Sequence, residues 1–254
     1  MPLERRGGER SLKVLEVKNL VKHYGKKEIL HDVSFSVEKG EVKAILGPSG
    51  SGKSTLLRCL NGLEEASSGH IYFDGQDLLA PETHWVEVRQ RIGMVFQNYE
   101  LFPNLTVLDN VLLGPLKVQK RKPAEAKAQA LQLLERVGLD ARAQDYPRQL
   151  SGGQKQRVAI VRALAMNPEV MLFDEVTASL DPEMVREVLE VIKSLAEDGT
   201  TMVLVTHEMQ FARQIADEIL FIDEGKVIEN DSPETFFNHP KTERAQRFLD
   251  SFTI

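Results

Sequence analysis

The chain has 254 residues, of which 42% are hydrophobic and 28% charged, and its formal net charge is −6. This composition is ordinary for a globular protein with a substantial core, and no apolar run approaches the roughly 18 residues that span a bilayer, so a membrane role requires a partner. The negative charge argues against a general nucleic-acid binder, which normally has a basic face. The only cysteine, Cys59, excludes an internal disulfide and is expected to be a small core residue.

The first part of the chain is predicted to be a polar tail followed by strands. Residues 1–11 contain no apolar stretch and are expected to form a flexible tail. Apolar and polar residues alternate over 12–37, most clearly at Val33, Phe35 and Val37, which predicts antiparallel strands. Tyr24 is open to two interpretations, because its ring can pack on a neighbouring strand or offer a flat face to a nucleobase.

A phosphate-binding loop follows these strands. It fits the pattern G-x-x-x-x-G-K-[ST], and it lies between a strand-like run at 41–46 and a helix-like run at 55–60. Glycines let successive backbone N–H groups approach phosphate oxygens, and the following helix adds its positive dipole end. Lys53 would pair with the β- and γ-phosphates, and Ser54 would place its hydroxyl on Mg²⁺. The loop consists of Gly47, Pro48, Ser49, Gly50, Ser51, Gly52, Lys53, Ser54 and Thr55. The sequence therefore predicts a site for a nucleoside triphosphate.

Two strands and a helical region come next. Short strands are predicted at 71–73 and 92–96, and the second ends at Gln97, which could reach Mg²⁺ or an attacking water at the sheet edge. Residues 98–150 are helix-like, and we expect them to form a lobe inserted into the sheet domain. Its helix signals are a capping pair, a proline for a first turn and a glycine stop, at Thr106 with Asp109, Pro123 and Gly138. A basic cluster at 117–127 is expected to be a solvated helix connection.

A second serine–glycine stretch opens the next predicted helix. Leu150, Ser151, Gly152, Gly153 and Gln154 precede the helix-like residues 155–164. Backbone N–H groups at such a helix start could grip an anion, although a simple helix cap with a turn is the alternative.

Polar residues end the two strands predicted after this helix. Val170–Asp174 reads as a fully buried strand that would deliver Asp174 to the Mg²⁺ shell, whereas Glu175 would face differently and could polarise a water. Taken alone, the acidic pair could also be a solvated strand end. Asp181 opens another helix, and the strand at 202–205 delivers His207 to the same edge. A hairpin around Asp223 and a C-terminal helix are expected to be structural.

Together these motifs resemble the ATP-binding subunit of ABC transporters over 12–252. The loop from Gly47 to Thr55 resembles the Walker A loop of that family, and Val170–Asp174 with Glu175 resembles its Walker B strand and catalytic glutamate. The remaining matches are Tyr24 to the adenine-stacking aromatic, Gln97 to the glutamine loop, Leu150–Gln154 to the signature motif, Ser179–Asp181 to the loop that meets the partner subunit, and His207 to the switch histidine. The runs 96–107, 174–183 and 206–209 are similar to the polar amino-acid importers of bacteria, with one departure: Ala178-Ser179 stands where that subfamily commonly has Ser-Ala.

The resemblance implies an α/β fold: a P-loop NTPase core (RecA-like) with an N-terminal antiparallel β region and an inserted helical lobe. The ATPase domain would cover 12–254, with 98–150 as helical subdomain. By resemblance, two copies sandwich two ATP molecules. Each chain would bind ATP with Tyr24 and its phosphate loop, bind Mg²⁺ with Ser54, Gln97 and Asp174, and hydrolyse ATP with Glu175, His207 and Gln97. The partner copy would contribute Ser151, Gly152, Gly153, Gln154 and Asp181.

The resemblance also implies partners. A membrane permease would contact the helical lobe, and a periplasmic or extracellular solute-binding protein would act through that permease. The chain would then lie at the cytoplasmic face of the cell (inner) membrane. The alternatives are an ABC ATPase for phosphate, a metal complex or a lipoprotein, a non-transport ABC ATPase, a small-molecule kinase, and a purely structural nucleotide-binding module.

Overall fold

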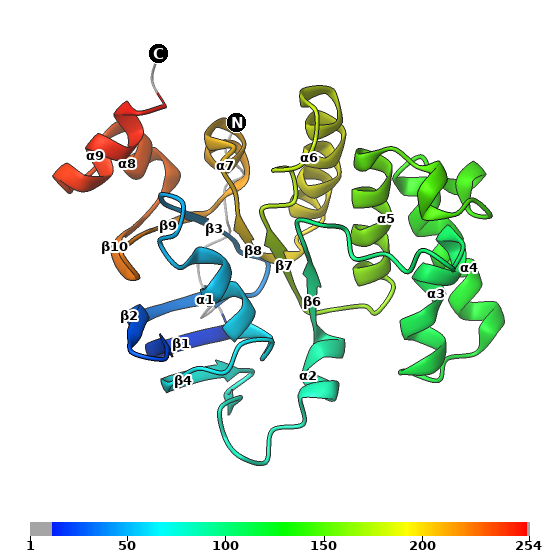
Figure 1. Cartoon of the computed structure of the whole chain (residues 1–254), viewed down its shortest axis with the longest axis horizontal. Helices are drawn as coiled ribbons and strands as arrows, with labels where there is room; N and C mark the ends of the chain where they lie inside the picture. The colour runs from blue at the N-terminus through cyan, green and yellow to red at the C-terminus, as the bar shows by residue number, and fades with distance from the viewer. Residues whose placement is uncertain (1–11, 253–254) are drawn as a thin grey trace.

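A computed structural model describes residues 12–252, and the tail expected at 1–11 lies outside this range (Figure 1). The described chain forms two sheets flanked by helices. The smaller sheet has the strand order β2-β1-β4-β5 and the larger has the order β10-β9-β3-β8-β7-β6. The strands of the smaller sheet are β1 (Lys13–Tyr24), β2 (Lys27–Glu38), β4 (Ser68–Phe73) and β5 (Gln76–Asp77).

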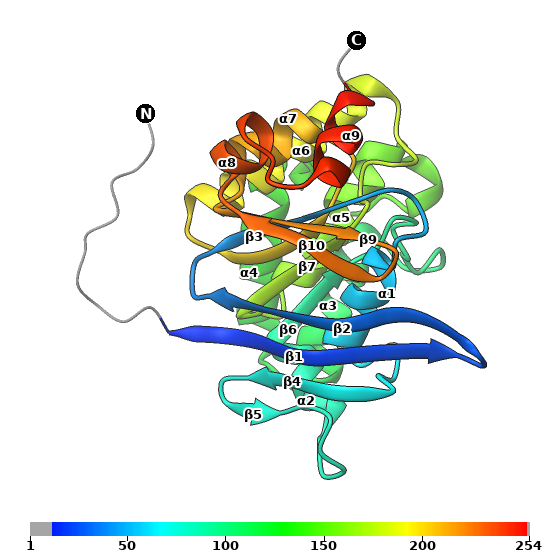
Figure 2. The same cartoon turned by 90° about the vertical axis from the view of Figure 1, so that its left-hand side faces the viewer.

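The smaller sheet is antiparallel throughout, as the alternation over 12–37 predicts. Leu15 pairs with Val37 and Val17 pairs with Phe35, and all four side chains are buried. A tight connection at Gly25, whose φ is +59°, joins the first two strands. Each of these strands is 12 residues long, so their hairpin spans the width of the molecule in Figure 2.

The larger sheet is mainly parallel, with an antiparallel hairpin at one edge. In it β3 pairs in parallel with β8 and β9, and β7 pairs in parallel with β6 and β8. Its strands are β3 (Val42–Leu46), β6 (Ile92–Val95), β7 (Val170–Asp174), β8 (Thr201–Val205), β9 (Glu218–Asp223) and β10 (Lys226–Asp231). Every residue of β3, β7 and β8 is buried, which explains their nearly continuous apolar sequences. Because β3, β7 and β8 are parallel, the loops that follow them meet at one edge of the sheet.

Helices and the smaller sheet cover opposite faces of the larger sheet. One core cluster contains Ile45 of β3 with residues of the smaller sheet and of α1, while Ala44 and Leu46 join a second cluster with α6, α7, α8 and α9. Figure 2 shows the smaller sheet below the larger one and these four helices above it. The flanking helices are α1 (Lys53–Leu60), α2 (Trp85–Arg91), α6 (Pro182–Glu197), α7 (Met209–Ile215), α8 (Pro233–Asn238) and α9 (Glu243–Asp250). Cys59 of α1 is buried in the first cluster, as expected.

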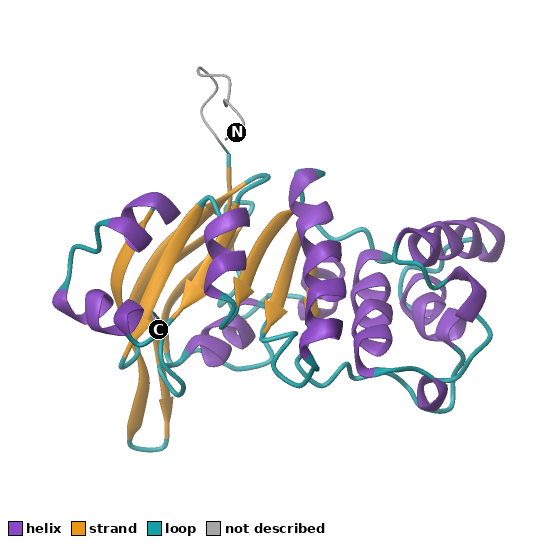
Figure 3. Ribbon diagram, turned by 90° about the horizontal axis from the view of Figure 1, so that it is seen from above, coloured by secondary structure: helices purple, strands orange, loops and turns teal. Residues whose placement is uncertain are grey.

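The remaining helices gather at one end of the molecule (Figure 3). They are α3 (Val107–Lys117), α4 (Pro123–Arg136), the short helices η1 (Asp140–Arg142) and η2 (Pro147–Gln149), and α5 (Gly152–Leu164). Thr106 caps α3 by accepting a hydrogen bond from the Asp109 N–H at 3.1 Å, and Gly138 has a φ of +69° after α4, so these start and stop signals are confirmed. Val158 and Val161 of α5 share a core with α3 and α4, so these helices pack together across the boundary predicted at residue 150.

The basic cluster in the α3–α4 connection is mostly exposed, although Arg121 donates a hydrogen bond to the carbonyl of Ala165 at 3.1 Å. Across residues 12–252, no helix combines the length and the apolar character that crossing a membrane requires.

Candidate active site

The phosphate loop lies between β3 and α1, and two of its glycines are required by close packing. A Cβ atom on Gly47 would lie 2.0 Å from the carbonyl oxygen of Ile222, and one on Gly52 would lie 2.9 Å from a methyl group of Leu30. Gly50 differs, because its φ is +79° but a Cβ atom there would have open space around it. The backbone of the loop is thus packed closely against β9 at Gly47 and against β2 at Gly52. At Gly50 it faces open space, where a phosphate chain fits.

Lys53, the first residue of α1, folds its side chain back over this loop. Its ammonium donates hydrogen bonds to the carbonyl oxygens of Gly47 at 3.0 Å and Pro48 at 2.9 Å, and it lies 3.9 Å from a carboxylate oxygen of Glu175. Burial lowers the pKa of Lys53, and the charges of Glu175 and Asp174 oppose that shift. The loop therefore holds a partly desolvated cation that can exchange weak carbonyl contacts for phosphate oxygens.

The Ser54 hydroxyl donates a hydrogen bond to Oδ1 of Asp174 at 2.6 Å. Asp174 ends β7 and is buried, and Arg58 of α1 lies 3.5 Å from its other oxygen. A hydroxyl and a carboxylate are oxygen ligands of the kind that Mg²⁺ takes together with substrate phosphates. Among residues 12–252, no cluster of three or more acidic, histidine or cysteine side chains forms a complete metal site. The donor set therefore fits Mg²⁺ held jointly by protein and nucleotide.

Glu175 and His207 form a pair at the same edge. Glu175 has a positive φ of 47°, and its N–H donates to the carbonyl of Val205 at 3.0 Å, so the chain turns away from β7 immediately after Asp174. His207 Nε2 donates to Glu175 Oε1 at 3.1 Å. This hydrogen bond, with the charges of His207 and Lys53, lowers the pKa of Glu175, although partial burial opposes the shift. Glu175 is thus kept ionised beside the phosphate loop.

Gln97 follows β6 and is exposed. Its backbone carbonyl accepts a hydrogen bond from the Ser179 hydroxyl at 3.3 Å, so the segment lies beside the loop that leads to Asp181. The described hydrogen bonds do not join the Gln97 side chain to Ser54 or Asp174, so its predicted metal role remains a prediction.

Tyr24 ends β1 and is 46% exposed. Partial burial and a hydrogen bond to the Glu64 carboxylate raise the pKa of the Tyr24 hydroxyl, and a hydrogen bond with Thr55 opposes this. Since Thr55 belongs to the phosphate loop, the structure brings the predicted base-stacking ring to the predicted phosphate site.

Ser151 caps α5 with a reciprocal pair of hydrogen bonds. The Gln154 N–H donates to the Ser151 hydroxyl at 3.2 Å, and the Ser151 N–H donates to Gln154 Oε1 at 2.9 Å. A Cβ atom on Gly152 would lie 2.9 Å from the Tyr99 hydroxyl, and one on Gly153 would lie 2.9 Å from Cβ of Met184. Figure 1 shows α5 standing apart from α1, with β6 and α6 between them. Within one chain, these residues are therefore not brought to Lys53.

Asp181 is exposed at the N-terminus of α6, and its side chain makes no capping hydrogen bond there. The hydrogen bonds and ion pairs found in residues 12–252 do not join its side chain to Lys53, Asp174 or Glu175, so its predicted contact with the ATP of a partner copy remains a prediction.

Two polar residues of α5, the buried Gln156 and the half-buried Arg162, have no place in the sequence motifs but contact the segment around Gln97. Gln156 donates a hydrogen bond to the carbonyl of Phe96 at 3.1 Å, and Arg162 donates to the carbonyls of Tyr99, at 3.2 Å, and Glu100. They link the helix that begins at Ser151 to the loop after β6. A single glutamine or arginine inside a helix carries no motif signal, which is why sequence reasoning misses them.

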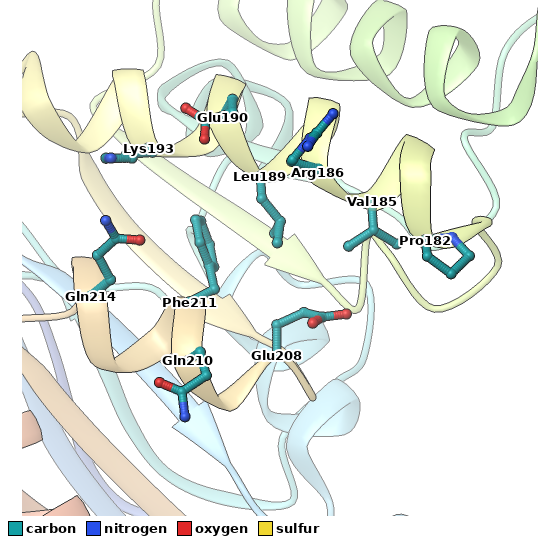
Figure 4. A pocket seen from close by; sticks show the side chains of 10 residues that line it. All are labelled: Pro182, Val185, Arg186, Leu189, Glu190, Lys193, Glu208, Gln210, Phe211 and Gln214. Carbon is teal, nitrogen blue, oxygen red and sulfur yellow. The ribbon is translucent and has the colours of Figure 1, made fainter.

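A separate hollow lies between α6 and α7 (Figure 4). Leu189 and Phe211 point into it from the two helices, and charged side chains such as Arg186 and Glu208 surround them. None of the residues predicted to contact ATP lines this hollow.

Three features define a P-loop nucleoside triphosphatase: a glycine-rich phosphate loop, a lysine folded over it, and an aspartate at the end of a nearby parallel strand. The sequence profile described as ABC transporter matches residues 30–178. The chain belongs to the ABC transporter family, and it is an ATPase of that family.

Relatives match along most of the chain. The arginine transport ATP-binding protein ArtM of Bacillus subtilis is 53% identical over 93% of this chain and 99% of its own length. The glutamate/aspartate import ATP-binding protein GltL of Escherichia coli is 52% identical over 93% of this chain and 98% of its own. A solved dimeric structure of the ATP-binding cassette MJ0796, in a post-hydrolysis state bound to ADP and Pi, has a TM-score of 0.77 and 35% identity, and it covers 86% of this chain and 98% of the other. The predicted fold class is confirmed by these relatives.

Proposed function

We propose that this chain is the subunit that hydrolyses ATP to power uptake of a polar amino acid through a membrane permease. The observation that carries the proposal is the assembly of Lys53, Ser54, Asp174, Glu175 and His207 at one sheet edge. The amino-acid class rests on relatives named for arginine transport and glutamate/aspartate import, which match nearly their whole length.

ATP occupies the phosphate loop, with its β- and γ-phosphates at Lys53 and its base on Tyr24. Ser54 and Asp174 would hold Mg²⁺ through their oxygens, with Gln97 as a further ligand, and the bound ion would neutralise charge on the phosphates. The short Ser54–Asp174 contact supports this role, because both oxygens already converge beside the loop.

Glu175 acts on the attacking water. Its lowered pKa keeps the carboxylate ionised near neutral pH, so it can orient the water and accept its proton. His207 is hydrogen-bonded to that carboxylate through Nε2, and its imidazole would sense the γ-phosphate when ATP is bound.

The second half of the site comes from a second copy of the chain. Its Ser151, Gly152, Gly153 and Gln154 approach the γ-phosphate with the N-terminal end of α5, and its Asp181 lies at the same interface. The separation of α5 from α1 within one chain supports this arrangement, as does the dimeric state of the MJ0796 cassette. ATP favours the closed dimer because its γ-phosphate bonds to both copies, whereas ADP lacks that group.

Movement of the dimer reaches the membrane through the helical lobe. Gln97 acts as its hinge, and the hydrogen bonds from Gln156 and Arg162 carry the motion of α5 to the same segment. The lobe contacts permease subunits, a solute-binding protein delivers the amino acid on the opposite side, and the chain lies at the cytoplasmic face of the cell membrane. A cassette for another solute is the alternative, because no residue described above contacts a solute.

The test is reconstitution of the chain with its permease in lipid nanodiscs. ATP hydrolysis is measured with the solute-binding protein loaded with arginine, glutamine, glutamate or cystine, and with phosphate as the control. We expect one polar amino acid to stimulate hydrolysis several-fold. Stimulation by phosphate alone, with none by amino acids, would contradict the proposed solute class.

A further inference from the structure

The Tyr24 ring is covered on one face. Nζ of Lys22 lies over the ring, 4.6 Å from its centroid, and the Tyr24 hydroxyl interacts with Glu64 and Thr55. An ammonium at this distance is attracted to the negative face of an aromatic ring. Tyr24 as a whole residue is 46% exposed, which leaves part of its surface open to a ligand.

Lys22 is itself fixed in place. Only 10% of its side chain is exposed, its ammonium donates to the carbonyl of Glu65 at 2.7 Å, and it lies 3.4 Å from a carboxylate oxygen of Glu64. A buried cation is retained only with such partners, so the Lys22 ammonium has little freedom to leave the face of the Tyr24 ring.

The partners of Lys22 belong to the segment that ends α1. The N–H groups of Leu63 and Glu64 both donate to the carbonyl of Arg58, at 2.9 and 3.2 Å, which folds this segment back onto the helix. The same helix starts at Lys53. One short helix therefore sets the position of the phosphate loop at one end and of the Tyr24 ring at the other.

We infer that Lys22 is a positioning residue for nucleobase binding: it covers one face of Tyr24 and holds the ring so that the opposite face receives the adenine. This inference rests on the proposed ATP site and adds a residue that no motif includes. Lys22 does not touch ATP. It restricts the ring before ATP binds, so less conformational entropy is lost when the base stacks on the ring.

A purely structural role would predict a different result. If Lys22 only joins β1 to the end of α1, its loss disturbs the phosphate loop and weakens every ligand of that loop. If it acts through Tyr24, its loss weakens ligands that carry a base and leaves inorganic tripolyphosphate unaffected.

The experiment compares ATP and tripolyphosphate by titration calorimetry of the full chain. Lys22→Gln removes the cation but keeps a donor for Glu65, and Lys22→Arg keeps the cation. Lys18→Gln is the control, since Lys18 lies on the same strand and its ammonium lies 5.0 Å from the centroid of another ring, that of Tyr72. We expect Lys22→Gln to raise the Kd of ATP about fivefold, which is about 1 kcal/mol, and to leave the Kd of tripolyphosphate unchanged. Lys22→Arg and Lys18→Gln should bind both ligands as the parent does.

Tyr24→Leu separates the two proposals. If this variant alone leaves the ratio of the ATP and tripolyphosphate Kd values unchanged, Tyr24 does not stack the base and both assignments fail. If Tyr24→Leu weakens ATP alone, Lys22→Gln in that background should add no further loss.

Three results would overturn the role of Lys22 while leaving Tyr24 in place. They are equal weakening of both ligands by Lys22→Gln, an unchanged Kd for ATP, and an undiminished effect in the Tyr24→Leu background. Should Lys22→Gln not fold, Glu64→Gln serves instead, because it removes the carboxylate partner of the ammonium at constant shape. That variant should raise the Kd of ATP about twofold without affecting tripolyphosphate, and an unchanged ratio would count against the inference.

Discussion

The Nε2 atom of His207 lies 3.1 Å from Oε1 of Glu175, although the two residues are 32 positions apart in the chain. They meet because β7 and β8 are parallel neighbours, so the residues that follow these strands emerge at the same edge of the sheet. The contact couples the carboxylate proposed to act on water with the imidazole proposed to sense the γ-phosphate.

Glu175→Gln removes the base and keeps the shape of the side chain. Steady-state hydrolysis should fall by about 10²-fold or more, the usual contribution of a general base, while ATP binding is retained. An ATP-bound dimer should then accumulate, and size-exclusion chromatography with light scattering would detect it. Unimpaired turnover in this variant would refute the role of Glu175.

The pKa of Glu175 has a consequence for stability. Its pKa is lowered from the ordinary value of 4.5 by His207, so the ionised form stabilises the folded chain. This contribution is fully present above pH 4.5 and is lost as pH falls through the lowered pKa of the folded state. Urea unfolding of the parent and of Glu175→Gln should therefore differ more at pH 7 than at acidic pH. In the His207→Ala background the difference at pH 7 should shrink, and an unchanged difference would show that the imidazole does not lower the pKa.

Gly47→Ala and Gly50→Ala distinguish the role of the loop glycines in packing from their role in letting a phosphate approach the backbone. A Cβ atom at Gly47 would meet the Ile222 carbonyl oxygen at 2.0 Å, so this variant should lose about 2–4 kcal/mol of unfolding free energy. Gly50 has open space, so Gly50→Ala should cost only about 1 kcal/mol through its positive φ, yet weaken ATP binding. Equal losses of stability in the two variants would contradict the packing of the loop on β9.

Ser151→Ala removes a helix cap as well as a proposed contact to ATP of the partner copy. Thr106→Ala is a matched control, because Thr106 caps α3 in the same way and has no proposed contact to ATP. Each variant should lose about 1 kcal/mol of stability, but only Ser151→Ala should slow hydrolysis, by about 10- to 100-fold. Equal hydrolysis rates in the two variants would assign Ser151 a capping role alone.

Much of the site was predictable because it is built from residue types in fixed order. The glycines of the phosphate loop, the apolar run ending in Asp174, and the strand before His207 each carry a local signal, and the structure places their side chains at one edge. Parallel strand order makes that convergence a physical expectation.

Other features have no local pattern. Lys22, Gln156 and Arg162 are single polar residues in a strand or a helix, and only tertiary contacts show that they hold Tyr24 and the segment around Gln97. The packing of α5 in the helical lobe also has no clear sequence signal. This helix is buried against both α3 and α6, so the spacing of its apolar residues does not indicate a single buried face. Positive φ values at Asn19 and Asp32 likewise interrupt strands that the alternation predicts to be regular.

The central claim is that one ATP is bound by two copies of the chain, and mixing two impaired variants tests it directly. Lys53→Ala lacks the phosphate contact of its own loop, and Ser151→Ala lacks the proposed contact to the ATP of the partner copy. In a mixed dimer, the loop of the Ser151 variant meets an intact Ser151 from the Lys53 variant, so one complete site forms. We predict that ATP hydrolysis by the mixture clearly exceeds the sum of the two variants alone and increases with total protein concentration. A rate equal to that sum at every concentration would contradict the shared site.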